Sequence, residues 1–128
     1  MNATLLVFLG AGIGGVLRHG VNLAAMRLFG MGFPWGTLAV NVVGSLAMGA
    51  LAGWLALKAG AGWTQPVRLF LATGILGGFT TFSAFSLDAV LLWERGQGGA
   101  AAAYVAASVA LSLAALAGGL TLVRVATS

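Results

Sequence analysis

Four apolar stretches, separated by short polar or glycine-rich segments, make up most of this chain. Each is at least as long as the roughly 20 residues that an α-helix needs to cross the hydrocarbon core of a bilayer. The stretches cover approximately residues 4–28, 35–57, 68–93 and 100–123. The pattern therefore predicts an all-α membrane protein in which residues 1–128 form a single domain of four transmembrane helices.

The segments between these stretches are too short for a further module. Residues from Gly60 to Pro66 break the chain between the second and third spans, with Trp63 as an interfacial anchor, and Gly96 to Gly99 link the third and fourth. The apolar run from Thr4 to Leu17 lacks a basic leading region and a small-residue cleavage site, so we expect it to be a span and not a processed signal.

Composition supports a membrane location. The chain is 60% hydrophobic and only 6% charged, which leaves too little polar surface for a soluble globule. Its net charge of +4 comes from scattered single residues, which suits lipid headgroups and does not indicate nucleic-acid binding. Cysteine is absent, so disulfides, thiolate metal sites and cysteine nucleophiles are excluded.

The basic residues are almost balanced between the two sides of the membrane. Counting loops alternately puts Lys58, Arg68 and Arg124 on one side and Arg27 and Arg95 on the other. Because an excess of Lys and Arg on the cytoplasmic side sets orientation, this near balance predicts insertion in both orientations and hence an antiparallel homodimer. The alternative is that one arginine decides a single topology.

The third apolar stretch is interrupted by an unusual segment from Gly74 to Ser86. Its glycines loosen the helix and its hydroxyls can form hydrogen bonds. We therefore expect a break in the middle of this span, and a site there that binds or conducts a small polar species.

Pairs of glycines four residues apart also occur, including Gly10 with Gly14 and Gly49 with Gly53. In a chain with 21 glycines, these pairs indicate ordinary tight helix packing more than a specified dimer face.

Two polar tracks with helical spacing lie within the spans. Thr37, Asn41 and Ser45 recur every four residues in the second span, and Tyr104, Ser108 and Ser112 do so in the fourth. A single hydroxyl in a membrane helix usually bonds to its own backbone, but aligned tracks and a costly intramembrane amide favour a functional role. The NH₂ group of Asn41 offers donors that suit an anion.

Aromatic and charged residues within the spans are further candidates for the functional site. Phe82 and Phe85 could turn their positive ring edges toward an anion, assisted by the hydroxyl of Ser83, although phenylalanine is common in membrane helices. Arg18 falls within the first span, where it either faces a water-filled vestibule or snorkels to the interface. Asp88 is interpreted as an interfacial carboxylate, with pairing to an arginine or a place in a vestibule as alternatives.

Several classes of function lack the residues they need. No acid stands in the middle of a span, which argues against proton-coupled cation export. His19 is the only histidine, so a histidine metal cluster is excluded, and no nucleophile with a base points to an enzyme. The polar groups that remain are neutral hydrogen-bond donors and aromatic edges.

At these residues the chain resembles the small dual-topology fluoride channels, the Fluc or CrcB family. The resemblance covers the whole chain and is carried by three segments: Gly14-Gly15-Val16-Leu17-Arg18, Gly36-Thr37-Leu38-Ala39-Val40-Asn41 and Gly77-Gly78-Phe79-Thr80-Thr81-Phe82-Ser83. It implies passive, electrodiffusive export of fluoride, giving fluoride resistance, through two pores at the interface of an antiparallel homodimer. It also implies a location in the cell inner membrane.

The resemblance implies roles for particular residues as well. A structural sodium ion at the dimer centre would be held by the backbone carbonyls of Gly77 and Thr80, and Arg18 would lie at the vestibule. The implied fluoride pore would be lined by Asn41, Phe82, Phe85, Thr37, Ser83, Tyr104, Ser108 and Ser112.

Two positions depart from the family pattern: Ala84 stands where many members have a hydroxyl residue, and Asp88 is one carbon shorter than the usual acid.

Three other functions are alternatives to the channel. A small multidrug exporter would need a glutamate in the first span, a noncatalytic subunit of a larger complex would use the glycine faces, and a lipid enzyme would need a convergent acid, histidine and serine.

Overall fold

The computed structural model describes residues 2–128 and contains four helical segments long and apolar enough to cross a membrane. The first, second and fourth are single helices, α1 (Ala3–Phe29), α2 (Trp35–Leu57) and α6 (Gly98–Ala126). The third, Thr64–Glu94, is composite. It consists of α3 (Thr64–Val67), the π-helical segment η1 (Arg68–Leu76), α4 (Gly77–Phe79) and α5 (Phe82–Glu94). The prediction of an all-helical protein with four membrane spans is confirmed.

Local residues explain where these helices begin and end. The side chain of Asn2 caps α1 by accepting a hydrogen bond from the Thr4 amide at 2.7 Å. Gly30 and Gly96 end α1 and α5 with positive φ angles of 76° and 78°, which glycine adopts without steric cost. The predicted break from Gly60 to Pro66 is too long, because α3 already begins at Thr64 and proline is tolerated in a first helical turn.

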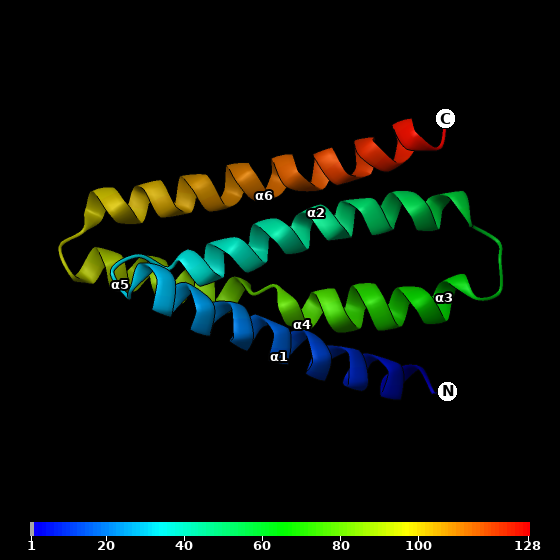
Figure 1. The fold of residues 1–128 in the computed structure, drawn as a ribbon, viewed down its shortest axis with the longest axis horizontal. Coiled ribbons are helices and arrows are strands. Elements are labelled where there is room, and N and C mark those ends of the chain that lie inside the picture. Colours follow the sequence, from blue (N-terminus) through cyan, green and yellow to red (C-terminus); the bar gives the residue numbers. More distant parts are fainter. Residues whose placement is uncertain (1) are drawn as a thin grey trace.

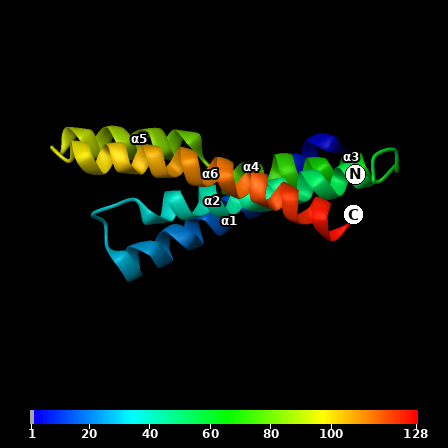
Figure 2. The ribbon, with the colours of Figure 1, turned by 90° about the horizontal axis from the view of Figure 1, so that it is seen from above.

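The four spans alternate in direction (Figure 1). Both termini and the α2–α3 connection lie at one end, which we call the terminal end, and the α1–α2 and α5–α6 connections lie at the other, the hairpin end. Helix α2 runs along α6, α1 runs along η1 and α4, and α5 pairs with α6. Viewed from above, α5 and α6 separate from α1 and α2 toward the hairpin end (Figure 2).

Glycines allow α1 and the third span to approach backbone to backbone. A Cβ atom on Gly10 would lie 2.9 Å from Cα of Gly74, and one on Gly14 would overlap the carbonyl oxygen of Ile75. Gly78 contributes from the third span in the same way, against α1. These glycine pairs therefore pack against each other within one chain.

The contact between α2 and α6 has the same construction. A Cβ atom on Gly49 would overlap the carbonyl oxygen of Leu116, and one on Gly119 would lie 2.9 Å from the amide nitrogen of Ala50. The tight helix contacts expected from small residues are thus made inside the chain.

Replacing Gly14 with alanine is expected to destabilise the protein by about 1–3 kcal/mol, because the added methyl group meets backbone that cannot move aside. Gly12→Ala is the matched control: it lies in the same helix with no atom within 4 Å of an added Cβ. It should be neutral or slightly stabilising, by up to about 1 kcal/mol. Thermal unfolding of both variants in detergent measures the difference, and equal midpoints would contradict this packing.

The buried side chains gather between α5 and α6. Tyr104 and Leu92 are fully buried, and Phe85 and Ala101 are nearly so. Much of the outer surface is apolar instead, as at Phe8 and Val16, which are 70% and 71% exposed. Such faces suit contact with lipid or with another membrane protein.

Candidate functional site

The third span is interrupted between α4 and α5. Thr80 and Thr81 have extended backbone, with φ and ψ of −87° and 159° at Thr80 and −155° and 121° at Thr81. Thr81 then caps α5, because its Oγ1 accepts a hydrogen bond from the Ala84 amide at 3.1 Å. The Thr80 hydroxyl donates back to the Leu76 carbonyl at 2.9 Å, which closes the end of α4.

The side chain of Asn41, from the second turn of α2, bridges this interruption. Its Nδ2 donates to the Thr81 carbonyl at 3.0 Å, and its Oδ1 accepts from the Thr81 amide at 2.7 Å. Both polar groups of one extended peptide residue are thereby satisfied by a single side chain. Asn41 was predicted to offer its NH₂ group to an anion; one N–H is used by Thr81, so its first role is to hold the interruption open.

These hydrogen bonds release two carbonyl groups. In an unbroken helix the Thr81 and Ala84 amides would donate to the carbonyls of Gly77 and Thr80, four residues earlier. Here those two amides donate to side-chain oxygens, Asn41 Oδ1 and Thr81 Oγ1. The carbonyls predicted to hold sodium are therefore the ones that lose their helical partners.

A groove of about 320 Å³ opens beside the interruption, between α2, α5 and α6. It brings together five of the eight predicted pore residues, which come from three helices. We call it the Phe82 groove; its lining consists of Asn41, Ser45, Thr80, Thr81, Phe82, Phe85, Ser108, Val109, Ser112 and Leu113. Among these described residues the polar groups are all neutral, and the remaining surface is aromatic or aliphatic.

The groove is incompletely covered in one chain. Phe82 is 79% exposed although its neighbour Phe85 is only 9% exposed, and their ring centroids lie 5.5 Å apart. The Ser108 hydroxyl is buried and has no hydrogen-bond partner among residues 2–128. An unpaired hydroxyl in an apolar setting is costly, so this position suits a ligand, water or another chain.

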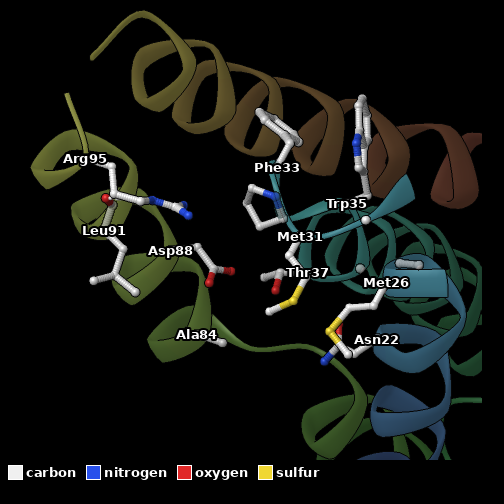
Figure 3. A pocket seen from close by; sticks show the side chains of 14 residues that line it. Asn22, Met26, Met31, Phe33, Trp35, Thr37, Ala84, Asp88, Leu91 and Arg95 are labelled. Carbon is white, nitrogen blue, oxygen red and sulfur yellow. Dashed lines mark hydrogen bonds between the residues drawn. The ribbon is translucent and has the colours of Figure 1, made fainter. Parts of the chain in front are cut away.

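A second hollow, of about 330 Å³, lies nearer the hairpin end between α5 and the α1–α2 pair (Figure 3). Thr37 lines this hollow and not the Phe82 groove, together with Asn22, Ala84, Asp88 and Arg95. We call it the Arg95 cleft. Of the predicted pore residues, Thr37 is therefore separated from the five that line the Phe82 groove.

Tyr104 is fully buried and links the residues of the two hollows. Its hydroxyl donates to Oδ2 of Asp88 in the Arg95 cleft at 3.2 Å, and its ring lies 5.2 Å from that of Phe85 in the Phe82 groove. This partner of Asp88 was not anticipated, although the sequence contains a signal for it. Asp88 and Tyr104 stand at equal sequence distances from the turn at Gly96, as expected of residues that face each other across a helical hairpin.

Besides Tyr104 and Gly77, which line neither hollow, two further predicted site residues lie outside both. Ser83 is exposed, with its Oγ 3.4 Å from Thr81 Oγ1. Arg18 lies one turn before Asn22 on the same face of α1, and its Nε is buried with no partner among residues 2–128. Neither is brought to the lining by the fold of a single chain, so their assigned roles remain predictions.

Comparison with known proteins identifies the family. The sequence profile of the CrcB-like proteins, described as camphor resistance (CrcB), matches residues 5–120. A protein of Methylobacterium nodulans named fluoride-specific ion channel FluC is 60% identical over 121 residues, 94% of this chain and 95% of that protein. Proteins of the same name from Rhodopseudomonas palustris and Granulibacter bethesdensis are 58% and 59% identical, covering 96% and 97% of this chain and 98% and 96% of their own lengths. The chain therefore belongs to the CrcB family, which consists of ion channels and not of enzymes.

Proposed function

We propose that this protein is a fluoride-selective channel that exports cytoplasmic fluoride by passive electrodiffusion and so gives fluoride resistance. The observation that carries the proposal is the Phe82 groove, in which neutral donors and aromatic rings from three helices meet beside an interrupted span. The names of the relatives supply the identity of the ion. The membrane would be the cell inner membrane.

The groove has the chemistry that a small, strongly hydrated anion needs. The hydroxyls of Ser108 and Ser112 and the remaining N–H of Asn41 can replace water, and ring edges of Phe82 and Phe85 present positive charge density. None of the described lining residues carries a fixed positive charge. Binding can therefore stay weak enough for rapid release, as conduction requires.

We propose that a second copy in antiparallel orientation covers the groove and completes two pores. Three features support this: the exposure of Phe82, the unpaired Ser108 hydroxyl, and the near balance of basic residues between the terminal and hairpin ends. Such a balance favours insertion of the chain into the membrane in both orientations. Cross-linking between tags on opposite membrane faces tests the orientation, and an exclusively parallel product would overturn it.

The same assembly would hold a structural sodium ion on its two-fold axis, at the membrane midplane. The carbonyls of Gly77 and Thr80 fit this role, because Asn41 and Thr81 occupy the amides that would otherwise bond to them. Two copies would supply four neutral oxygen ligands, which suit a small hard cation. When bound, the ion would neutralise converging carbonyl dipoles and join the two subunits.

Removal of sodium is expected to weaken the dimer. Replacing Na⁺ with N-methylglucamine on both sides should lower the thermal midpoint and the fluoride flux together, because the converging carbonyls lose their counter-charge. Potassium should restore less than sodium, since K⁺ is larger than Na⁺ and four carbonyl oxygens suit the smaller ion better. Unchanged melting and flux after exhaustive exchange would contradict the sodium assignment without affecting the proposed selectivity.

The function itself is tested by anion efflux from liposomes that contain the purified protein, with a potassium ionophore to cancel the membrane voltage. Rapid fluoride efflux with little chloride efflux is expected. No fluoride efflux from folded, dimeric protein would favour the alternative of a noncatalytic subunit in a larger membrane complex, and co-purification of a partner would then be sought.

A further inference from the structure

We propose that Arg95 is an anion-capture residue, and that the Arg95 cleft is an entrance through which fluoride reaches the Phe82 groove. This inference rests on the proposed channel function. It adds a position outside the predicted pore and vestibule residues, since Arg18 was the arginine expected at a vestibule and Arg18 does not line the cleft.

The side chain of Arg95 points into the cleft (Figure 3). Arg95 caps the end of α5, with its backbone amide bonded to the Leu91 carbonyl at 3.1 Å. Its side-chain Nε donates to the same carbonyl at 3.3 Å. This second bond turns the guanidinium back over the last turn of α5, where it points into the hollow above Asp88 (Figure 3).

Asp88 explains why a positive charge is needed there. Its carboxylate lines the same hollow, two helical turns before Arg95 on the same face of α5. A negative charge at the mouth of an anion pathway lowers the local anion concentration, and a nearby positive charge offsets it. The buried Tyr104 hydroxyl donates to Oδ2 of Asp88 and so fixes this carboxylate, whereas Arg95 is exposed.

Side chains in contact connect the lining of the cleft to that of the Phe82 groove. Thr37 lies beside Asp88 in the cleft (Figure 3), and Tyr104, which donates to Asp88, has its ring 5.2 Å from that of Phe85 in the groove. Arg95 itself is exposed, so water screens its attraction for the ion. The residue would raise the rate of capture without holding fluoride tightly.

The test compares Arg95→Gln with Arg27→Gln by fluoride efflux at a fluoride concentration low enough for entry to limit flux. Arg27 is the matched control: it is exposed, lies at the same hairpin end, and does not line the cleft. Both substitutions remove one charge and alter the balance of basic residues identically. Efflux is measured at low and high concentrations of an impermeant salt, where the screening length is about 30 Å at 0.01 M and about 3 Å at 1 M.

We expect Arg95→Gln to reduce efflux about two- to fivefold at low salt and little at high salt, Arg95→Lys to restore most of it, and Arg27→Gln to act weakly. An equal loss in both glutamine variants would overturn the inference in favour of a diffuse surface potential. An unchanged rate in Arg95→Gln would overturn it directly. Absence of fluoride efflux in the unmodified protein would instead reject the channel function, so the two failures are distinguishable.

Discussion

Replacement of Asn41 with leucine is expected to abolish fluoride flux and to destabilise the fold. Leucine is of similar size but removes both hydrogen bonds to Thr81, so the amide and the carbonyl of that residue lose their partners inside the membrane. Each unsatisfied group costs about 1–3 kcal/mol. The extended backbone at Thr80 and Thr81 would then relax toward continuous helix, and the Gly77 carbonyl would regain its helical donor.

Asn41→Asp removes one of the two bonds to Thr81 and keeps the other. A carboxylate can still accept from the Thr81 amide, and it replaces the Nδ2 donor with a negative charge in the groove. This variant should remain dimeric and conduct fluoride at least about tenfold more slowly. Ser45→Ala, one turn along α2 in the same groove, is the control and should retain most of the flux.

Efflux from liposomes and thermal unfolding measure the two effects. Wild-type flux in Asn41→Asp would show that the amide has no part in conduction. Wild-type stability in Asn41→Leu would show that the bridge to Thr81 does not maintain the interruption.

Phe82→Ile is expected to lower fluoride flux by about tenfold or more while leaving stability nearly unchanged. Phe82 is 79% exposed in the single chain, so the fold of one subunit does not depend on its ring, and isoleucine keeps an apolar surface for the second copy that we propose covers the groove. Isoleucine removes the positive ring edge from the groove and keeps an apolar side chain there. The loss of flux would therefore report on the aromatic ring and not on folding.

Leu113→Ile is the control for Phe82→Ile, because Leu113 lines the same groove and is 67% exposed. It changes shape without removing an aromatic ring, so its flux should stay near that of the unmodified protein. Both proteins should be compared as dimers in the same lipid, by initial efflux rate and by thermal midpoint. Unchanged flux in Phe82→Ile would eliminate the aromatic-edge mechanism.

Much of the fold could be predicted from the sequence because hydropathy acts locally. The second span was predicted at residues 35–57 and is Trp35–Leu57, and the first and fourth agree within a few residues. The segment from Gly74 to Ser86 was also marked in advance, since glycine and hydroxyl residues within an apolar stretch are visible without knowing their neighbours. Helix ends were less certain, as the helical position of Pro66 shows.

The sequence by itself thus determined which segments enter the membrane, their alternation, and the residue types available to an anion. Only the tertiary structure decided that Asn41 reaches Thr81, forty positions away, and that Tyr104 partners Asp88. It also placed Thr37 in the Arg95 cleft, apart from the five predicted pore residues that line the Phe82 groove, and it packed the glycine pairs into contacts within the chain. The physical reason is that transfer into lipid depends on each segment's own side chains, whereas hydrogen bonds and hollows depend on how helices cross and rotate against one another.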